Sequence, residues 1–503
     1  MQTPGTSRGP AREGRLAHWA PLAVLMAGTF MFVLDFFIVN VALPSIQHGL
    51  HAGGGAIEWV VAGYSLTTAT LLITWGRLGD HLGRRRAYMA GLTIFVVSSA
   101  LCALALDPTM LVAARLLQGV GAAALAPNIL SLIGVLYQGQ ERTRAISVYG
   151  MVLGLAATTG QLIGGILINV DIGGIGWRAI FWINLPIGLS ALVAAPRLLP
   201  PSRVDEEGRF DIGGVVLATT ALVAALLPLI QGRADSWPVW SWVCLGASPL
   251  LFAGFWFQQR RTAKGTGTAL LDPSIVVGPL RVGLITQLTF WTQQAAGFTF
   301  LALYLQDGRH ISPLRSGVIF AMLAAGFVLT SFPAPALVQR FGRNVVLVGS
   351  LTAGIGDVFL AVWVFHIGTG GSAALLLPGL FLIGAGQGAC LTPLTATIMA
   401  HATPTTAGAV NGALSTLQQA GNAIGVAVFG VVFYGQQVHG YGNSYAWTAV
   451  AMAVALALVA LLTRALPPTE RDEPAIRTPD SPPASEGMDG HNAGVTATHQ
   501  AQP

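Results

Sequence analysis

Asp35 and Arg115 are the residues of this sequence whose placement points most directly to chemistry. Each is a charged group that interrupts a long apolar segment. Because an ionised carboxylate is costly in an apolar medium, Asp35 is expected to face a protein interior, to pair with a cation or to carry a proton. Those properties suit a proton-coupling group. The alternative is a structural carboxylate that Arg115 neutralises, and one group can do both in different states.

Arg115 itself has two interpretations. Its guanidinium either reaches toward a surface along its apolar stem, or lies in the interior beside the acid. Asp357 is a second acid deep in an apolar segment. It is either a further proton-coupling group or a structural group that binds loop elements, and the sequence leaves both open.

The segments that carry these charges predict an all-α polytopic membrane protein. Of the 503 residues, 53% are hydrophobic and only 9% are charged, whereas a soluble protein has about 25% charged residues. A helix needs about 20 apolar residues to cross a bilayer. Fourteen transmembrane helices are predicted near 19–44, 57–76, 87–106, 109–134, 145–168, 179–198, 212–231, 238–257, 283–305, 316–338, 345–366, 375–399, 407–434 and 445–465.

The distribution of the basic residues predicts the orientation. With the N-terminus inside, 21 of the 26 lysines and arginines fall on the inner side, four fall outside and Arg115 lies within a helix. This asymmetry follows the positive-inside rule. We therefore expect a multi-pass protein of the plasma membrane, with a cytoplasmic N-terminus at 1–18 and a disordered cytoplasmic tail at 466–503.

Two similar landmarks indicate an internal repeat. Gly83-Arg84 recurs as Gly342-Arg343, an offset of 259 residues, and the glycine motif at 160–164 recurs at 421–425, an offset of 261. The spacing predicts a six-helix bundle at 19–198, a linker with two extra helices at 199–282 and a second six-helix bundle at 283–465. Two such halves are typical of secondary transporters with a substrate site between them.

The turn between the second and third predicted helices has the composition of a cytoplasmic gate. The positive-inside rule explains its arginines, but it does not explain an acid among glycines, which permit a tight turn and close helix approach. We interpret the acid and arginines as a latch that holds one state closed. The predicted gate residues are Gly76, Asp80, Gly83, Arg84 and Arg85.

Five segments together resemble the 14-helix drug/proton antiporters of the major facilitator superfamily, over nearly all of 19–465. They are 34–44, 76–86, 115–123, 160–165 and 177–188. The resemblance implies the major facilitator fold, alternating access and a proton-coupling role for Asp35 and Arg115. It also implies export, because 160–165 resembles the family's antiporter motif in helix 5.

That helix 5 motif departs from the family at one position. The motif residues are Gly160, Gln161, Gly164 and Gly165, and the family usually has proline where this chain has Gln161. Glutamine restores a backbone donor that proline would remove. The glycines still permit close helix packing. Asn422 occupies the equivalent place in the repeat, so we expect the two amides to face each other across the pseudo-twofold axis.

Other polar and aromatic side chains within the predicted helices are candidates for substrate contact. A tryptophan in a membrane helix is more often a packing or interface residue, but buried amides in lipid need partners. The acid Glu58, in contrast, is expected at the membrane interface. The candidates are Tyr64, Trp291, Gln294, Asn411, Gln418 and Asn422.

The sequence contains no phosphate-binding loop, nucleophile elbow or metal-ligand cluster, so we expect no enzyme, metal or cofactor. An ion gradient must then supply the energy. We predict a proton-driven exporter of hydrophobic drugs or antibiotics that works as a monomer and does not bind nucleic acid. The alternatives are a proton-coupled transporter of an endogenous metabolite and a membrane receptor.

Overall fold

The computed structural model describes residues 11–201, 211–232, 235–264, 269, 273–276, 279–399 and 407–466. Most of the predicted tail lies outside this range, as do the first ten residues. The described chain is built from helices, which is the arrangement that satisfies backbone hydrogen bonds inside a bilayer.

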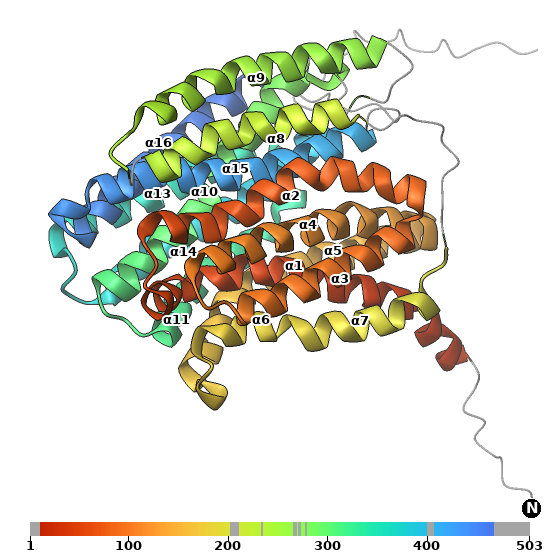
Figure 1. Cartoon of the computed structure of the whole chain (residues 1–503), viewed down its shortest axis with the longest axis horizontal. Coiled ribbons are helices and arrows are strands. Elements are labelled where there is room, and N and C mark those ends of the chain that lie inside the picture. Colours follow the sequence, from red (N-terminus) through yellow and green to blue (C-terminus); the bar gives the residue numbers. More distant parts are fainter. Residues whose placement is uncertain are drawn as a thin grey trace, which may run out of the picture.

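The helices lie side by side (Figure 1). The first group comprises α1 (Ala11–Leu50), α2 (Gly54–Leu82), α3 (Arg84–Ala103), α4 (Pro108–Leu136), α5 (Gly139–Val170), α6 (Ala179–Trp182) and α7 (Asn184–Leu198). Two further helices follow, α8 (Ile212–Leu227), which continues into the π-helical η3 (Pro228–Gly232), and α9 (Val239–Lys264).

The last group begins with α10 (Pro279–Leu303), which continues into the π-helical turn η5 (Tyr304–Gly308). The remaining long helices are α11 (Pro313–Ser331), α13 (Asn344–Ile367), α14 (Leu377–Met399), α15 (Ala407–Gly435) and α16 (Tyr441–Arg464), with the short α12 (Ala334–Phe341) after α11. Short 3₁₀ turns occupy several connections: η1 (Ile172–Gly174), η2 (Gly176–Arg178), η4 (Pro273–Val276), η6 (Ala373–Leu376) and η7 (Gln437–His439).

Eleven helices of the described chain are long and apolar enough to cross a membrane, or twelve if the bent α5 counts as one span. The helices α2 and α10 are not among them, although they contain 29 and 25 residues. Amides such as Gln287, Gln293 and Gln294 make α10 less apolar. The membrane fold is therefore confirmed, and the count of fourteen is consistent with it but stays a prediction.

The first and last groups pack their helices in the same order. In the first group α1 packs on α5, while α4 packs on both α2 and α3. In the last group α10 packs on α15, while α14 packs on both α11 and α13. The division at 19–198, 199–282 and 283–465 remains a prediction, but this pairing is what a structural repeat requires.

The two groups meet along a seam in which α2 packs on α15 and α5 packs on α11. The pair α8 and η3 contacts both α2 and α15, so it lies across this seam. We call the end of the bundle with the turn before Arg84 the Arg84 end, and the end with His48 the His48 end. The helices run between these two ends (Figure 1).

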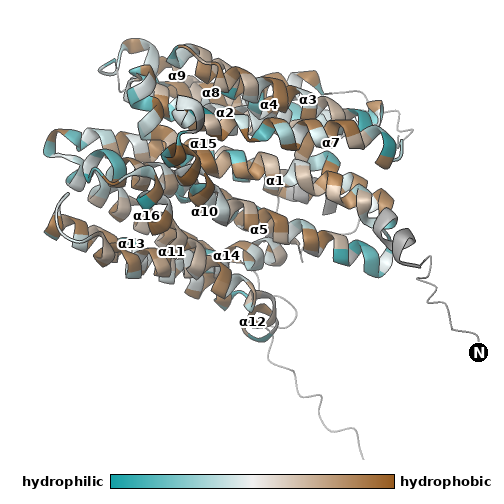
Figure 2. Ribbon diagram, turned by 90° about the horizontal axis from the view of Figure 1, so that it is seen from below, coloured by the Kyte–Doolittle hydropathy of each residue, from teal (hydrophilic) through white to brown (hydrophobic). Residues whose placement is uncertain are grey.

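Most helices of the bundle are rich in apolar residues, as Figure 2 shows by the brown colour. Large hydrophobic side chains are exposed there, among them Val193, Leu250 and Leu461 at 64%, 73% and 60%. Exposed apolar surface on helices of this length is the side that lipid covers.

Candidate functional site

The structure brings Asp35 and Arg115 together in the middle of the first group of helices. The Nη1 of Arg115 donates to the Oδ2 of Asp35 at 2.5 Å. Neither side chain is exposed to solvent. The surface-reaching interpretation of Arg115 is therefore wrong for this conformation, because its guanidinium points into the protein.

Two amides complete the carboxylate's hydrogen bonds. The Oδ1 of Asp35 accepts from Gln118 Nε2 at 2.9 Å and from Asn184 Nδ2 at 2.8 Å. The same Gln118 presents its Oε1 to Arg115 Nη1 at 2.7 Å. Two amide donors and one guanidinium thus balance a charge that would otherwise be costly to bury.

Arg115 is held on its other sides by α2 and an aromatic ring. Its Nε donates to the carbonyl of Val60 at 3.0 Å, and its Cζ lies 4.4 Å from the ring centre of Tyr64. The Nη2 of Arg115 has no hydrogen-bond partner among the described residues. The arginine is thus firmly placed but retains an unpaired Nη2, which a rearranged acceptor can use.

Helix order explains why these residues meet. Asp35 is on α1, Arg115 and Gln118 share a face of α4 because they are three residues apart, and Asn184 begins α7. Asn184 Nδ2 also donates to Ser99 Oγ of α3 at 3.0 Å. Helices α4 and α7 therefore both donate to a carboxylate on α1, and α3 contacts Asn184 beside it.

Gln118 and Asn184 were not assigned a role from the sequence. Each lies in a segment that carries the family resemblance, 115–123 and 177–188. A usable signal was the three-residue spacing from Arg115 to Gln118. No comparable spacing reveals Asn184, because it reaches Asp35 from 149 residues away along the chain.

Asp357 does not join this site. It is buried on α13, which packs between α14 and α16 in the other half. Its Oδ2 has no hydrogen-bond partner in the described part of the chain. The structure thus separates the three predicted proton-coupling residues into one pair and one remote acid.

The glycine-rich turn at the Arg84 end has a clear physical basis. A Cβ added at Gly79 would lie 1.9 Å from Asn128 Oδ1 of α4, and Gly83 has a φ of 99°. Arg85 Nη1 donates to the carbonyl of Leu199 beyond α7 at 3.1 Å. These contacts fix α2 and α3 to their neighbours, while the side chain of Asp80 lies outside the described residues and its latch role stays a prediction.

The second half repeats part of this arrangement. Gly342 also has a positive φ, of 55°. Arg343 then donates through Nη1 to the carbonyl of Leu466 beyond α16. An arginine after a turn glycine therefore ties two helices together in each half.

The helix 5 glycines allow α5 to lie directly on α1. A Cβ at Gly160 would lie 3.0 Å from Phe37 Cβ, and one at Gly164 would lie 2.6 Å from Val41 Cγ1. Gly165 instead faces the other half, where its added Cβ would lie 2.7 Å from the carbonyl of Pro313. One motif thus serves both packing within a half and packing across the seam.

Gln161 and Asn422 are both buried, but no hydrogen bond joins them among the described contacts. Gln161 Nε2 donates to the carbonyl of Phe37 on α1 at 2.9 Å, so its amide is held within its own half. The Oδ1 of Asn422 has no hydrogen-bond partner in the described chain. A direct pairing of these amides is therefore absent in this conformation.

The substrate-contact candidates other than Asn422 divide into three groups. Tyr64 belongs to the Asp35 site, where its OH donates to the carbonyl of Phe32 at 3.1 Å. Trp291 and Gln294 are buried on α10, and Gln418 is half-buried on α15. The side chain of Asn411 lies outside the described residues.

A chain of amides accompanies Gln294. Gln387 Nε2 of α14 donates to Gln293 Oε1 at 3.2 Å, and Gln293 Nε2 donates to Gln294 Oε1 at 3.2 Å. These three side chains are nearly fully buried. They form a buried polar cluster between α10 and α14.

The sequence predicted that Glu58 lies at the membrane interface, but the structure buries it fully. It lies on α2 against α15, where a Cβ added at Gly430 would lie 2.9 Å from its carboxyl carbon. The expectation was wrong because α15, some 370 residues away along the chain, covers this acid.

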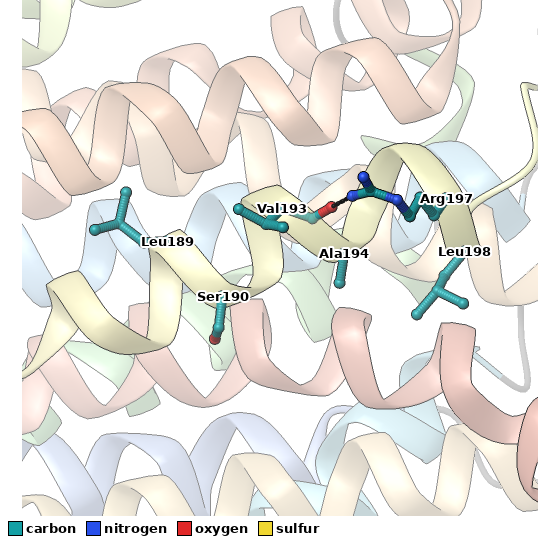
Figure 3. Close-up of a pocket in the computed structure, with 6 residues that line it drawn as sticks. All are labelled: Leu189, Ser190, Val193, Ala194, Arg197 and Leu198. Carbon is teal, nitrogen blue, oxygen red and sulfur yellow. Dashed lines mark hydrogen bonds between the residues drawn. The ribbon is translucent and has the colours of Figure 1, made fainter.

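A shallow pocket occurs on the outside of α7 (Figure 3). It contains none of the predicted site residues, and its lining comes from a single helix. Arg197 Nη1 donates there to the carbonyl of Val193 at 3.2 Å, as the figure shows. The lining residues are Leu189, Ser190, Val193, Ala194, Arg197 and Leu198.

Comparison with known proteins agrees with this architecture. Residues 25–426 match the family described as Major Facilitator Superfamily. The chain is 34% identical to the probable actinorhodin transporter of Streptomyces coelicolor, covering 86% of this chain and 75% of that one. It is 31% identical to the cephamycin export protein CmcT of Amycolatopsis lactamdurans, with coverage of 93% and 97%.

A relative from a mycobacterium and a solved structure extend the comparison. The chain is 31% identical to the drug efflux pump JefA of Mycobacterium tuberculosis, over 80% of this chain and 78% of that one. The crystal structure of a peptide transporter POT in complex with sulfate superposes with a TM-score of 0.64 at 16% identity, covering 89% and 95% of the two chains. At that identity the likeness shows the fold alone.

Proposed function

Because this chain belongs to the major facilitator superfamily, we propose that it is a secondary active exporter of hydrophobic drugs or antibiotics, driven by proton antiport through alternating access. The relatives named for actinorhodin, cephamycin and drug efflux support the direction and the substrate class. The observation that carries the proposal is the buried Asp35–Arg115 pair.

The pair can couple proton binding to a change of state. A proton on Asp35 removes the charge that holds Arg115, and a neutral carboxyl group is a much weaker partner for a guanidinium. Arg115 must then find other acceptors, for which its free Nη2 is already available. Two arrangements of Arg115 would thus correspond to the transporter with Asp35 protonated and to the transporter with Asp35 ionised.

Arginine placement supports an orientation in which the Arg84 end is cytoplasmic and the His48 end faces outward. With that orientation the protein lies in the plasma membrane with both termini inside. We propose that the monomer is the transporting unit, because the two halves of one chain each form one side of the substrate site between them. Protons and a small apolar molecule are its partners, and no step requires a cofactor.

Transport of the dye Hoechst 33342 in inside-out vesicles tests this function. We expect an imposed proton gradient, acidic in the lumen, to drive dye accumulation, and Asp35→Asn to reduce it at least about tenfold, because the replacement amide cannot exchange a proton. Glu141→Gln is the matched control, since Glu141 is a half-exposed acid that pairs with His18.

Two results would overturn the proposal. Full gradient-driven accumulation in Asp35→Asn would exclude the acid from coupling. Unchanged drug sensitivity of a pump-deficient host that expresses the chain would favour a metabolite transporter or a receptor instead.

A further inference from the structure

Three polar contacts between the two halves lie toward the His48 end of the described chain. Thr299 Oγ1 donates to Asn40 Oδ1 at 2.9 Å, and Gln306 Nε2 donates to the carbonyl of Val41 at 2.7 Å. Nearer the end, His48 Nε2 lies 3.1 Å from Asp307 Oδ1. All these contacts join α1 to α10 or η5, so they hold the two halves together at this end.

The His48–Asp307 contact differs from the other two because it joins two ionisable side chains. It is also asymmetric, since 77% of the His48 side chain is exposed but only 8% of the Asp307 side chain is. The Oδ2 of Asp307 has no hydrogen-bond partner in the described part of the chain. A neutral histidine therefore leaves a nearly buried carboxylate with its negative charge uncompensated, and one added proton makes the pair neutral.

The other ionisable groups around Asp307 do not remove this charge. His310 follows in the same loop, Tyr441 faces it from α16, and both are coupled to it electrostatically. Arg309 is engaged elsewhere, with Tyr304 Oη at 3.1 Å and the carbonyl of Gly371. Burial raises the pKa of Asp307 above its usual range, and His48 and His310 only partly oppose this.

The direction in which pH affects closure follows from the raised pKa of Asp307. Separation of the halves would expose Asp307 to water and return its pKa toward the ordinary value, so the closed seam binds the proton more tightly than the open one. Acid pH therefore favours closure at the His48 end. As the pH rises through the raised pKa of the closed state, that contribution to closure is lost.

We propose that Asp307, together with His48, is a proton-sensing latch that closes the outer gate when it is protonated from outside. The inference rests on the proposed function for its orientation. The latch proton enters from the outer side and returns to it, so it is distinct from the proton carried at Asp35. In an antiporter, closure of the outer gate after external protonation resets the carrier to face the cytoplasm.

Spin-label distance measurements in lipid nanodiscs test the latch. Labels are placed by Val170→Cys at the end of α5 and Val438→Cys in η7, both exposed at the His48 end, with the native cysteines at 102, 244 and 390 replaced by alanine. As the pH falls from 8.5 to 5.5, we expect the ratio of the closed to the open population to rise several-fold. The rise can reach about tenfold for each unit by which the pKa of Asp307 differs between the two states.

Three variants separate the latch from other sources of pH dependence. Asp307→Asn should abolish most of this response. Gln306→Leu removes a contact without ionisable groups, so it should shift the closed-to-open ratio at every pH. The slope of that ratio against pH should stay the same. Asp35→Asn should keep the slope while losing gradient-driven transport, which makes failure of the latch distinguishable from failure of the transport function.

An unchanged pH response in Asp307→Asn would overturn the proposal. A response of the opposite sign, with the His48 end opening as the pH falls, would overturn it as well. His48→Gln adds an independent arm, because it keeps a hydrogen-bonding side chain but no titrating partner. Because His48 opposes the raised pKa of Asp307, we expect this variant to move the midpoint of closure to higher pH, and an unmoved midpoint would exclude His48 from the latch.

Discussion

At the scale of single residues, the ion pair of Asp35 depends on neighbours as much as on its partner. Gln118 and Asn184 each donate to the carboxylate, and both are fully buried. A hydrogen bond to a charged group contributes about 1.5–3 kcal/mol. These amides are therefore expected to position the acid and to stabilise its ionised form.

Replacement of Asn184 by alanine tests this positioning role. We expect Asn184→Ala to destabilise the protein by roughly 1.5–3 kcal/mol and to lower its thermal midpoint by a few degrees, measured by scanning fluorimetry in detergent. The pH profile of transport should shift as well, which a purely structural change would not cause. Ser190→Ala, on the outer face of α7, is the control; equal midpoints and profiles for the two variants would contradict the role.

At the scale of elements, glycines set how closely the helices approach. Gly164 and Gly160 bring α5 onto α1, while Gly421 and Gly425 bring α15 onto α10. The contact of Gly425 is especially tight, because an added Cβ would lie 1.7 Å from the carbonyl oxygen of Thr292. Backbone oxygens cannot move aside without displacement of a whole helix.

Gly425→Ala is therefore expected to be destabilising despite the higher helix propensity of alanine. Overpacking of this kind costs about 1–3 kcal/mol, and it should reduce both the yield of folded protein and its thermal midpoint. Gly435→Ala is the matched control, because nothing lies within 4 Å of its added Cβ. The packing argument fails if the two variants unfold at the same temperature.

At the scale of the whole molecule, the structure has its two halves joined by hydrogen bonds toward the His48 end. Alternating access requires this end to open during the cycle. The Asn40–Thr299 contact lies across the seam and is fully buried. A covalent link at this position should therefore stop the cycle in the state with the His48 end closed.

A double variant, Asn40→Cys with Thr299→Cys, provides that link through a short bifunctional thiosulfonate. We expect cross-linking to abolish vesicle transport, and a reducing agent to restore it. Each single cysteine variant, treated in the same way, should keep its activity. Undiminished transport by the cross-linked protein would show that the two halves need not separate here.

The sequence alone determined the membrane-protein class, the helical fold and the family, and it singled out Asp35 and Arg115, whose coupling role stays a prediction. It could do so because apolar segment length, the placement of arginine and local glycine motifs are all properties of neighbouring residues. The same reasoning correctly expected close helix approach at Gly160 and Gly164.

Only the tertiary structure decided which distant side chains meet. Asn184 reaches Asp35 across 149 residues, His48 reaches Asp307 across 259, and Glu58 is buried by a helix from the other half. It also set Asp357 apart from the ion pair. The physical reason is that hydropathy predicts only that a segment is a membrane helix. Which face the helix turns to its neighbours depends on packing between helices that are far apart in the chain. That packing therefore decides the partners of each buried charge.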